Sequence, residues 1–155
     1  MTKEDVTKRV EQLKTSRSQT LDRINAMMSI QFEDFNEDTE ELMVSFPVEE
    51  WMLNPGDVMH GGLIATAFDI ALGFHTLIVE REKTIVTTNL SLQYVKQVPL
   101  NSRLVVKSKV VRDGRSLVNL YAEGFVDDSD EIVATAVCTY MKLDNNKDSD
   151  RKMKV

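Results

Sequence analysis

Apolar residues recur at steps of three and four, apart from one gap, among charged neighbours near the start of the chain. Within residues 3–28 these positions are Val6, Val10, Leu13, Leu21, Ile24 and Met27. This period predicts an amphipathic helix with a narrow apolar stripe. Arg17 and Thr20 stand where a heptad seam needs apolar side chains, so the pattern favours a packed surface helix over a coiled coil.

The middle of the chain predicts two strands and then a long helix. Apolar segments over 29–35 and 40–48 flank the polar sequence NEDTE, which is typical of two strands joined by a tight turn, and Pro47 should end the second strand. Residues 61–79 are apolar on almost every side of a helix and rich in Ala and Leu. A helix of that kind is expected to be buried.

The second half of the chain predicts four long strands in meander-like succession. Residues 84–95 alternate, with Val86, Thr88, Leu90, Leu92 and Tyr94 on one face and Thr87, Asn89, Ser91 and Gln93 on the other. Strands over 103–111 and 116–126 meet at Asp113-Gly114, a hairpin signal because glycine accepts a positive φ. With a last strand over 132–143, the pattern predicts an α+β fold, an antiparallel sheet wrapped around a central helix.

Length and charge narrow the class of protein. The 155 residues, 42% hydrophobic, fit one domain over 29–144, with a helical extension over 1–28 and a charged flexible tail over 145–155. A net charge of -6 argues against nucleic acid or an anionic membrane as a partner. The single Cys138, without a Cys/His cluster, predicts neither disulfide nor metal site, and the charged N-terminus is unlike a signal peptide. We therefore expect a cytoplasmic protein.

Residues 54–73, NPGDVMHGGLIATAFDIALG, hold the candidate chemistry. Asp69 is the one carboxylate in the apolar helix, and burying its charge costs several kcal/mol unless partners compensate, so it is an internal cap or a working group. Gly61 and Gly62, preceded by His60, leave backbone N–H groups open at a helix start, which suits an anion or a developing oxyanion.

The spacing of these groups bears on how they combine. Gly61 and Asp69 lie eight residues apart, which is about 12 Å along a helix. One helix cannot bring both to one reacting atom. If they belong to a single site, the helix start of one subunit must meet Asp69 of another.

The spacing as a whole resembles the signature of the PaaI-like acyl-CoA thioesterases of the hotdog-fold superfamily. The signature is Asn54, five residues, HGG, six residues, Asp69, three residues and Gly73. The segments VTTNLSLQYVKQVP and VVRDGRSLVNLYAEGFVDDSDEIVATAVCTYMKL are similar to the later strands of that family, so the resemblance spans about residues 30–143. It implies a hotdog thioesterase domain that hydrolyses an acyl-CoA without a cofactor, as a homodimer or homotetramer. Asn101 stands where relatives often have glycine after a proline, and asparagine tolerates the positive φ of such a turn.

The resemblance also implies a catalytic site built from two chains. Asn54, His60 and the N–H of Gly61 come from one subunit, and Asp69 and Thr87 come from its partner. In such enzymes the Gly61 N–H polarises the thioester carbonyl, while Asp69 attacks it or activates water. Asn54 would position the water or nucleophile, Thr87 would hydrogen-bond it, and His60 would orient the loop or the thioester.

Five further residues are expected to bind the substrate. Gly62 and Thr88 neighbour the predicted catalytic residues, whereas Arg103, Lys107 and Lys109 share one face of a strand and form a local basic patch. Such a patch could hold the phosphates of coenzyme A. The alternative is a solvated outer face whose charges discourage aggregation through the sheet.

Other interpretations remain open at this point. One is a non-catalytic acyl-CoA-binding or regulatory hotdog protein, and another is a hotdog dehydratase, which moves protons on an acyl chain with a histidine and a carboxylate. His75 lies outside any helical metal-ligand spacing and is predicted to pack or to line a pocket. Cys138 has no neighbouring base and is predicted to be a buried strand thiol.

Overall fold

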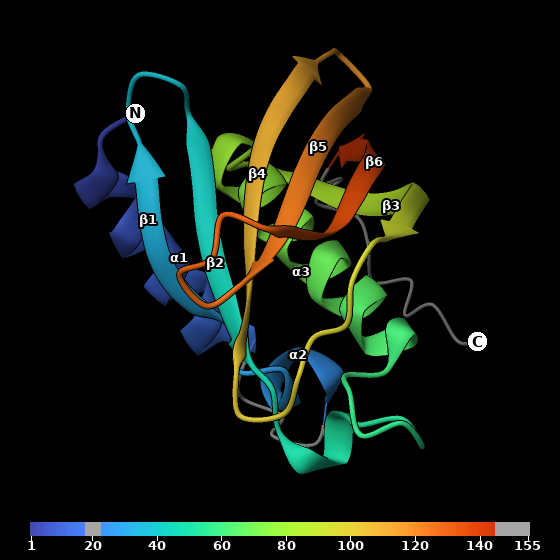
Figure 1. Ribbon diagram of the computed structural model, residues 1–155. Coiled ribbons are helices and arrows are strands. Elements are labelled where there is room, and N and C mark those ends of the chain that lie inside the picture. Colours follow the sequence, from blue (N-terminus) through green and yellow to red (C-terminus); the bar gives the residue numbers. More distant parts are fainter. Residues whose placement is uncertain (18–22, 145–155) are drawn as a thin grey trace.

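The computed structural model describes residues 1–17 and 23–144, which form three α-helices, one 3-10 helix and one six-stranded sheet. The elements are α1 (Lys3–Arg17), α2 (Ile24–Met27), β1 (Gln31–Asn36), β2 (Glu41–Pro47), the 3-10 helix η1 (Glu50–Met52), α3 (Gly61–Val79), β3 (Lys83–Tyr94), β4 (Arg103–Asp113), β5 (Leu117–Val126) and β6 (Ile132–Asp144). The sheet curves around α3, as Figure 1 shows. The predicted α+β architecture is confirmed, including the end of β2 at Pro47 and the extra N-terminal helix.

The strand order differs from a simple meander. The six strands lie in the order β1-β2-β4-β5-β6-β3, and neighbouring strands are antiparallel. β3 follows α3 along the chain but pairs with β6, so the predicted succession holds only for β4, β5 and β6. The reason is that α3 lies between β2 and β3 in sequence and carries the chain across the sheet to its far edge.

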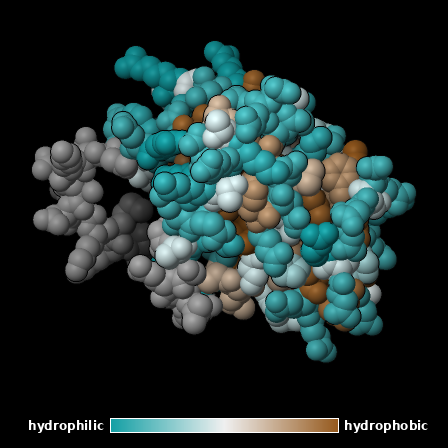
Figure 2. All heavy atoms as spheres, turned by 90° about the vertical axis from the view of Figure 1, so that its left-hand side faces the viewer, coloured by the Kyte–Doolittle hydropathy of each residue, from teal (hydrophilic) through white to brown (hydrophobic). Residues whose placement is uncertain are grey.

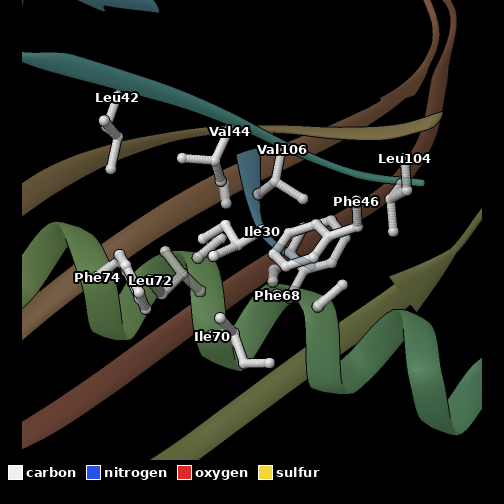
Figure 3. Close-up of a cluster of buried hydrophobic side chains, with 14 of the residues drawn as sticks. Ile30, Leu42, Val44, Phe46, Phe68, Ile70, Leu72, Phe74, Leu104 and Val106 are labelled. Carbon is white, nitrogen blue, oxygen red and sulfur yellow. The ribbon is translucent and has the colours of Figure 1, made fainter. Parts of the chain in front are cut away.

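α3 forms the centre of the hydrophobic core. It packs against β2, β3, β4, β5 and β6, and Figure 3 shows apolar side chains of α3, β2 and β4 filling the space between helix and sheet. At Gly124 of β5 an added Cβ would lie 2.8 Å from the ring of Phe68, so the helix approaches this strand closely. By length and composition Gly61–Val79 could cross a membrane, but 61% of its apolar window is buried inside the protein, as in a core helix.

The N-terminal helix covers one side of this core. Val6, Val10 and Leu13 of α1 are buried, as predicted, and α1 packs against β1 and α3. Its outer face remains polar, and Figure 2 shows that the side of the molecule carrying α1 and β1 is largely hydrophilic. Thr2 and Asp5 cap the helix reciprocally, with the Thr2 hydroxyl donating to Asp5 over 2.8 Å and accepting from the Asp5 N–H over 3.2 Å.

The prediction of one helix over 3–28 is wrong in its second half. α1 ends at Arg17, and Ile24 and Met27 of the short α2 are 42% and 40% exposed. A helix of four residues does not continue the stripe of α1, and Met28 and Ile30 enter the core instead. Leu21 and the tail over 145–155 lie outside the described residues.

Two predicted turns form in different ways. Asn101 has a φ of 61°, so the positive φ expected there is confirmed. The hairpin at Asp113-Gly114 also forms, but Gly114 has no positive φ. Its N–H donates to the carbonyl of Leu117 over 2.9 Å and closes a longer connection than a two-residue turn, so the left-handed conformation is not required.

His75 of α3 is a buried packing residue, as predicted. It is 1% exposed, and its Nδ1 lies 2.9 Å from the Oγ of Ser108 on β4. Burial lowers the pKa of His75 from 6.5 to about 4, opposed in part by a backbone contact with Glu40. The imidazole is therefore neutral in the folded protein at neutral pH.

We predict that this histidine makes the fold sensitive to mild acid. Between its folded and unfolded pKa values the unfolded chain binds more protons, so stability falls as the pH falls below the unfolded value. The free energy of unfolding should decrease by about 2 kcal/mol between about pH 7 and about pH 5. Urea unfolding across this range should show the slope in the native sequence and not in His75→Gln.

The chain offers a matched control, because it contains only two histidines and the other, His60, is exposed. His60→Gln should keep the slope. An equal slope in His75→Gln and in the native sequence would contradict the assignment.

Candidate active site

Asp69 is anchored by two hydroxyl groups from the edge of the sheet. The Oγ1 of Thr87 donates to Asp69 Oδ1 over 2.9 Å, and the hydroxyl of Tyr140 lies 2.7 Å from the Asp69 carbonyl oxygen and 3.1 Å from Oδ1. Thr87 and Tyr140 are directly opposite each other in the β3–β6 ladder. Charge in the apolar helix is thus compensated by hydrogen bonds to the carboxylate.

Gly73 explains part of the sequence pattern around Asp69. It lies one turn further along α3, on the same face of the helix. An added Cβ at Gly73 would stand 3.4 Å from the hydroxyl oxygen of Tyr140, closer than most Cβ contacts. A glycine four residues after Asp69 therefore leaves room for the tyrosine that holds the carboxylate.

A β-bulge turns Thr87 toward Asp69. The register of β3 against β6 shifts between Thr87 and Asn89, so an extra residue stands in β3 at Thr88. As a result Thr87 shares the inner face with Leu90 and Leu92, which pack on the core, whereas Val86 is 43% exposed. The regular alternation predicted for this strand, with Thr87 and Leu90 on opposite faces, is wrong because one residue was inserted into the ladder.

Thr88, predicted to contact substrate, takes the place of the inserted residue. Its hydroxyl donates to the carbonyl oxygen of Thr139 on β6 over 2.9 Å. That bond stabilises the bulge. A contact of Thr88 with substrate stays a prediction.

A pocket of about 130 Å³ opens beside Asp69. Its lining combines the polar cluster with apolar side chains of α3 and β3, and one residue of α2 closes it. These residues are Asn25, Asp69, Ile70, Gly73, Phe74, Leu77, Ile85, Thr87 and Tyr140. The pocket can accept a small apolar group next to a carboxylate.

A second cluster of predicted residues lies at the start of α3. His60 is the N-cap, and its Nδ1 accepts a hydrogen bond from the N–H of Gly62 over 2.9 Å. The N–H of Gly62, expected to be open, is thus used by the cap. A contact of Gly62 with substrate stays a prediction. A neutral His60 whose Nδ1 accepts carries its proton on Nε2, which leaves a ring donor at the helix start.

Gly61 keeps its N–H available. As the first residue of the helix it has no acceptor within the helix, and none of the turns and caps over residues 1–17 and 23–144 accepts a hydrogen bond from it. Tyr94 at the end of β3 donates to the carbonyl oxygen of Gly61 over 2.9 Å and fixes the helix start against the sheet. Tyr94 and Tyr140 were missed by sequence reasoning, since their roles depend on strand positions far from α3 in sequence.

Asn54 organises the loop before α3. Its Oδ1 accepts from the N–H of Gly56 over 2.8 Å, and its own N–H donates to the carbonyl of Val58 over 2.8 Å. This is the turn role expected of an asparagine before a proline. The carbonyl side of the amide is occupied by the turn, so a catalytic role would fall to the NH₂ group.

The predicted basic patch is not a surface of unpaired cations. Arg103 pairs with Glu33 at 2.7 Å, Asp128 at 3.5 Å and Asp127 at 3.7 Å. Lys107 pairs with Glu41 at 3.2 Å, and Lys109 lies 5.7 Å from the ring centre of Tyr121. Neighbouring strands and the β5–β6 turn supply these carboxylates.

These cations also lie on a different surface from Asp69. They alternate along β4 with the buried Leu104, Val106 and Ser108, which face α3, so they project from the outer face of the sheet. A hollow of about 320 Å³ around Arg103 and Lys107 is larger than the pocket at Asp69, but Arg103 is paired with acids that line the hollow and Lys107 is paired with Glu41. Phosphate binding by Arg103, Lys107 and Lys109 stays a prediction.

Within one chain, therefore, the predicted catalytic residues form two clusters. Asp69 meets Thr87 and Tyr140, whereas Asn54, His60 and Gly61 gather at the helix start. Among residues 1–17 and 23–144 no group of three or more His, Cys, Asp or Glu could hold a metal ion. The arrangement offers a carboxylate in one place and helix-start N–H donors in another, the two elements that thioester hydrolysis requires.

Comparison with known proteins places the chain in a class. A family model described as the thioesterase superfamily matches residues 56–133, and the chain belongs to this superfamily. The E. coli PaaI protein from the phenylacetic acid degradation operon superposes with a TM-score of 0.76 at 13% identity, covering 91% of this chain and 95% of that one. The predicted hotdog fold and the resemblance to PaaI-like thioesterases are confirmed.

Two curated relatives carry a more specific name. Acyl-coenzyme A thioesterase THEM4 of Rattus norvegicus is 35% identical over 96 residues, which cover 60% of this chain and 39% of the relative. The protein of the same name from Bos taurus is 30% identical over 115 residues, which cover 74% of this chain and 46% of the relative. The chain spans less than half the length of these relatives.

The one cysteine stands beside the Asp69 cluster without being a nucleophile. Cys138 is 2% exposed, and burial raises the pKa of its thiol to about 11. We predict that a maleimide labels the native protein far more slowly than the urea-unfolded protein, because thiolate and access are both lacking. Equally rapid labelling of the native protein, measured by mass, would contradict the predicted role as a buried strand thiol.

Proposed function

We propose that this protein hydrolyses an acyl-CoA thioester to the free acid and coenzyme A. The observation that carries the proposal is the carboxylate of Asp69, held by Thr87 and Tyr140 at the wall of a pocket. Membership in the thioesterase superfamily and the name of the curated relatives support the same reaction.

The active unit in this proposal is a dimer. β3 is the last strand in the sheet order that the described residues form, and an edge strand of 12 residues is a template for a second copy. Two-fold pairing at this edge would be isologous, with the same surface on both subunits. Such pairing would let the helix start of one subunit approach Asp69 of the other, as the distance of about 12 Å along α3 requires for a single site.

Each group then has a role that its environment supports. The N–H of Gly61, at the positive end of the α3 dipole, would stabilise the oxyanion that forms on the thioester carbonyl. Asp69 of the partner would remove a proton from a water molecule that attacks the carbonyl carbon, or would attack that carbon itself. The carbon–sulfur bond then breaks, and coenzyme A leaves as a thiol after taking up a proton. In the second case a mixed anhydride forms on Asp69, and water then hydrolyses it to release the acid.

The remaining predicted residues would assist these steps. The amide NH₂ of Asn54 and the Nε2–H of His60 are donors left open by the loop and the cap, and they can orient the water or the thioester. Thr87 would keep the carboxylate in place. Arg103, Lys107 and Lys109 are carried forward as candidate phosphate contacts, for which the ion pairs of Arg103 and Lys107 would have to open. A cytoplasmic location is part of the same proposal.

The first prediction concerns Asp69 itself. Asp69→Asn should lower kcat for acyl-CoA hydrolysis by about 10²- to 10⁴-fold, because the amide can neither attack nor accept a proton. Release of free thiol from a panel of acyl-CoAs measures this and reveals the acyl preference. Asp38→Asn, in the exposed turn between β1 and β2, is the matched control and should keep full activity.

The same assay separates the rival functions. Tight acyl-CoA binding without turnover by the native protein would favour a non-catalytic binding or regulatory protein. Hydration of an enoyl thioester in place of hydrolysis would favour a dehydratase. Either result would overturn the proposed reaction.

The second prediction tests the site shared between subunits. Asn54→Ala and Asp69→Ala should each be inactive, and mixing them should restore activity, since one site of a mixed dimer collects both defects and the other is intact. Random exchange of equal amounts should recover about one quarter of the native activity. Absence of recovery, with subunit exchange verified by mass, would contradict the shared site.

A further inference from the structure

We propose that Tyr140 is a positioning residue for Asp69 and that Oδ2 of Asp69 is the oxygen that acts on the substrate or on water. This inference rests on the proposed hydrolysis and deepens it, because it assigns the reacting atom and adds a residue that sequence reasoning did not find. Three observations carry it: the hydrogen bonds to the carboxylate, the burial of the tyrosine, and the register of β3 and β6.

The two oxygens of Asp69 are in different environments. Oδ1 lies 2.9 Å from the Thr87 hydroxyl and 3.1 Å from the Tyr140 hydroxyl, and both hydroxyls donate to it. Over the described residues, no hydrogen bond is found to Oδ2. The two hydrogen bonds occupy lone pairs of Oδ1 and stabilise its negative charge, which makes Oδ1 less reactive. Oδ2 is therefore the oxygen left to attack or to accept a proton.

Tyr140 fixes the carboxylate relative to its own backbone. Its hydroxyl lies 2.7 Å from the Asp69 carbonyl oxygen as well as 3.1 Å from Oδ1, so one proton is shared between two acceptors of the same residue. This bridge holds the side chain of Asp69 close to the helix backbone. A carboxylate held in one rotamer presents Oδ2 in one direction, as a reacting group needs.

The tyrosine is suited to donate and is not a catalytic acid or base. Tyr140 is 3% exposed, and burial, reinforced by Cys138 and by the charge of Asp69, raises its pKa. Its hydroxyl therefore stays protonated and remains a donor at neutral pH. Gly73, which has no side chain, leaves room for this hydroxyl beside Asp69.

Thr87 alone would give a weaker anchor. It lies on the exposed edge strand at a bulge, whereas Tyr140 lies on β6, which is paired on both sides by β5 and β3. The two residues face each other across the ladder, so the bulge and the tyrosine together place both donors on one oxygen. Tyr140 is the part of this arrangement that the interior of the sheet holds in place.

Tyr140→Phe tests the inference because it removes the hydroxyl and keeps the ring. We expect kcat to fall by about 10- to 100-fold, the range for losing a hydrogen bond to a charged group, with little change in KM. The acidic limb of the pH–rate profile should also move to higher pH, because a carboxylate with fewer donors takes up a proton more readily. A packing defect alone would lower stability without moving that limb.

The controls separate this inference from the proposed function. Tyr121→Phe removes a hydroxyl that bonds to Glu123 over 3.0 Å on the outer face, and it should leave kcat and the pH profile unchanged. Thr87→Ser should retain most activity, whereas Thr87→Val should lose activity and shift the same limb as Tyr140→Phe.

The outcomes are distinct. If the native protein hydrolyses acyl-CoA and Asp69→Asn does not, but Tyr140→Phe keeps the native kcat and pH profile, then only the role of Tyr140 is overturned. If the native protein shows no hydrolysis, or Asp69→Asn retains it, the proposed function fails and this inference fails with it. Loss of kcat with the shifted limb, in a variant that unfolds at the same urea concentration as the native protein, supports the inference.

Discussion

The helix α3 has more apolar surface than a flat sheet can cover on one side, and this constraint shapes the molecule. Its buried residues stand on almost every face of the helix, so the sheet must curve around it and α1 must cover the side that remains. Burial of apolar side chains is worth about 25 cal/mol per Å², which makes this wrapping the main favourable contribution to folding. The order of the strands, the edge strand β3 and the pocket at Asp69 all depend on where the sheet begins and ends around α3.

The same constraint makes polar groups on α3 informative. On α3, His75 is buried and Asp69 is half-buried, and each is accommodated differently. His75 gives up its charge beside Ser108, whereas Asp69 is supplied with hydroxyl donors from β3 and β6. His75 is held neutral and contributes to packing. Asp69 has hydrogen-bond donors and lies at the wall of a pocket, where a carboxylate can still react.

Sequence patterns captured what depends on neighbours along the chain. The bounds of α3, the two strands before it and the three strands after β3 follow from local periodicity, and the spacing of Asn54, the two glycines and Asp69 identified both clusters. The pairing of β3 with β6 was not predictable in this way, because it depends on how far α3 carries the chain.

The misses at the site have the same origin. A period of two cannot reveal an inserted residue, so the faces of β3 around Thr88 were assigned wrongly. Tyr140 lies 71 residues from Asp69, and nothing local marks it as its partner. Likewise, the cations of β4 look unpaired in sequence because Glu33 and Glu41 come from other strands.

The pocket at Asp69 is lined by parts of the chain that differ in how well they tolerate substitution. Most of the lining belongs to α3 and the strands, where a change of volume disturbs the core, but Asn25 belongs to α2, a single helical turn outside the sheet. Substitutions in that turn can reshape one wall without altering the register of any strand. The N-terminal segment is thus a place where homologous chains can change the shape of this pocket while Asp69 and the hydroxyls that hold it stay the same.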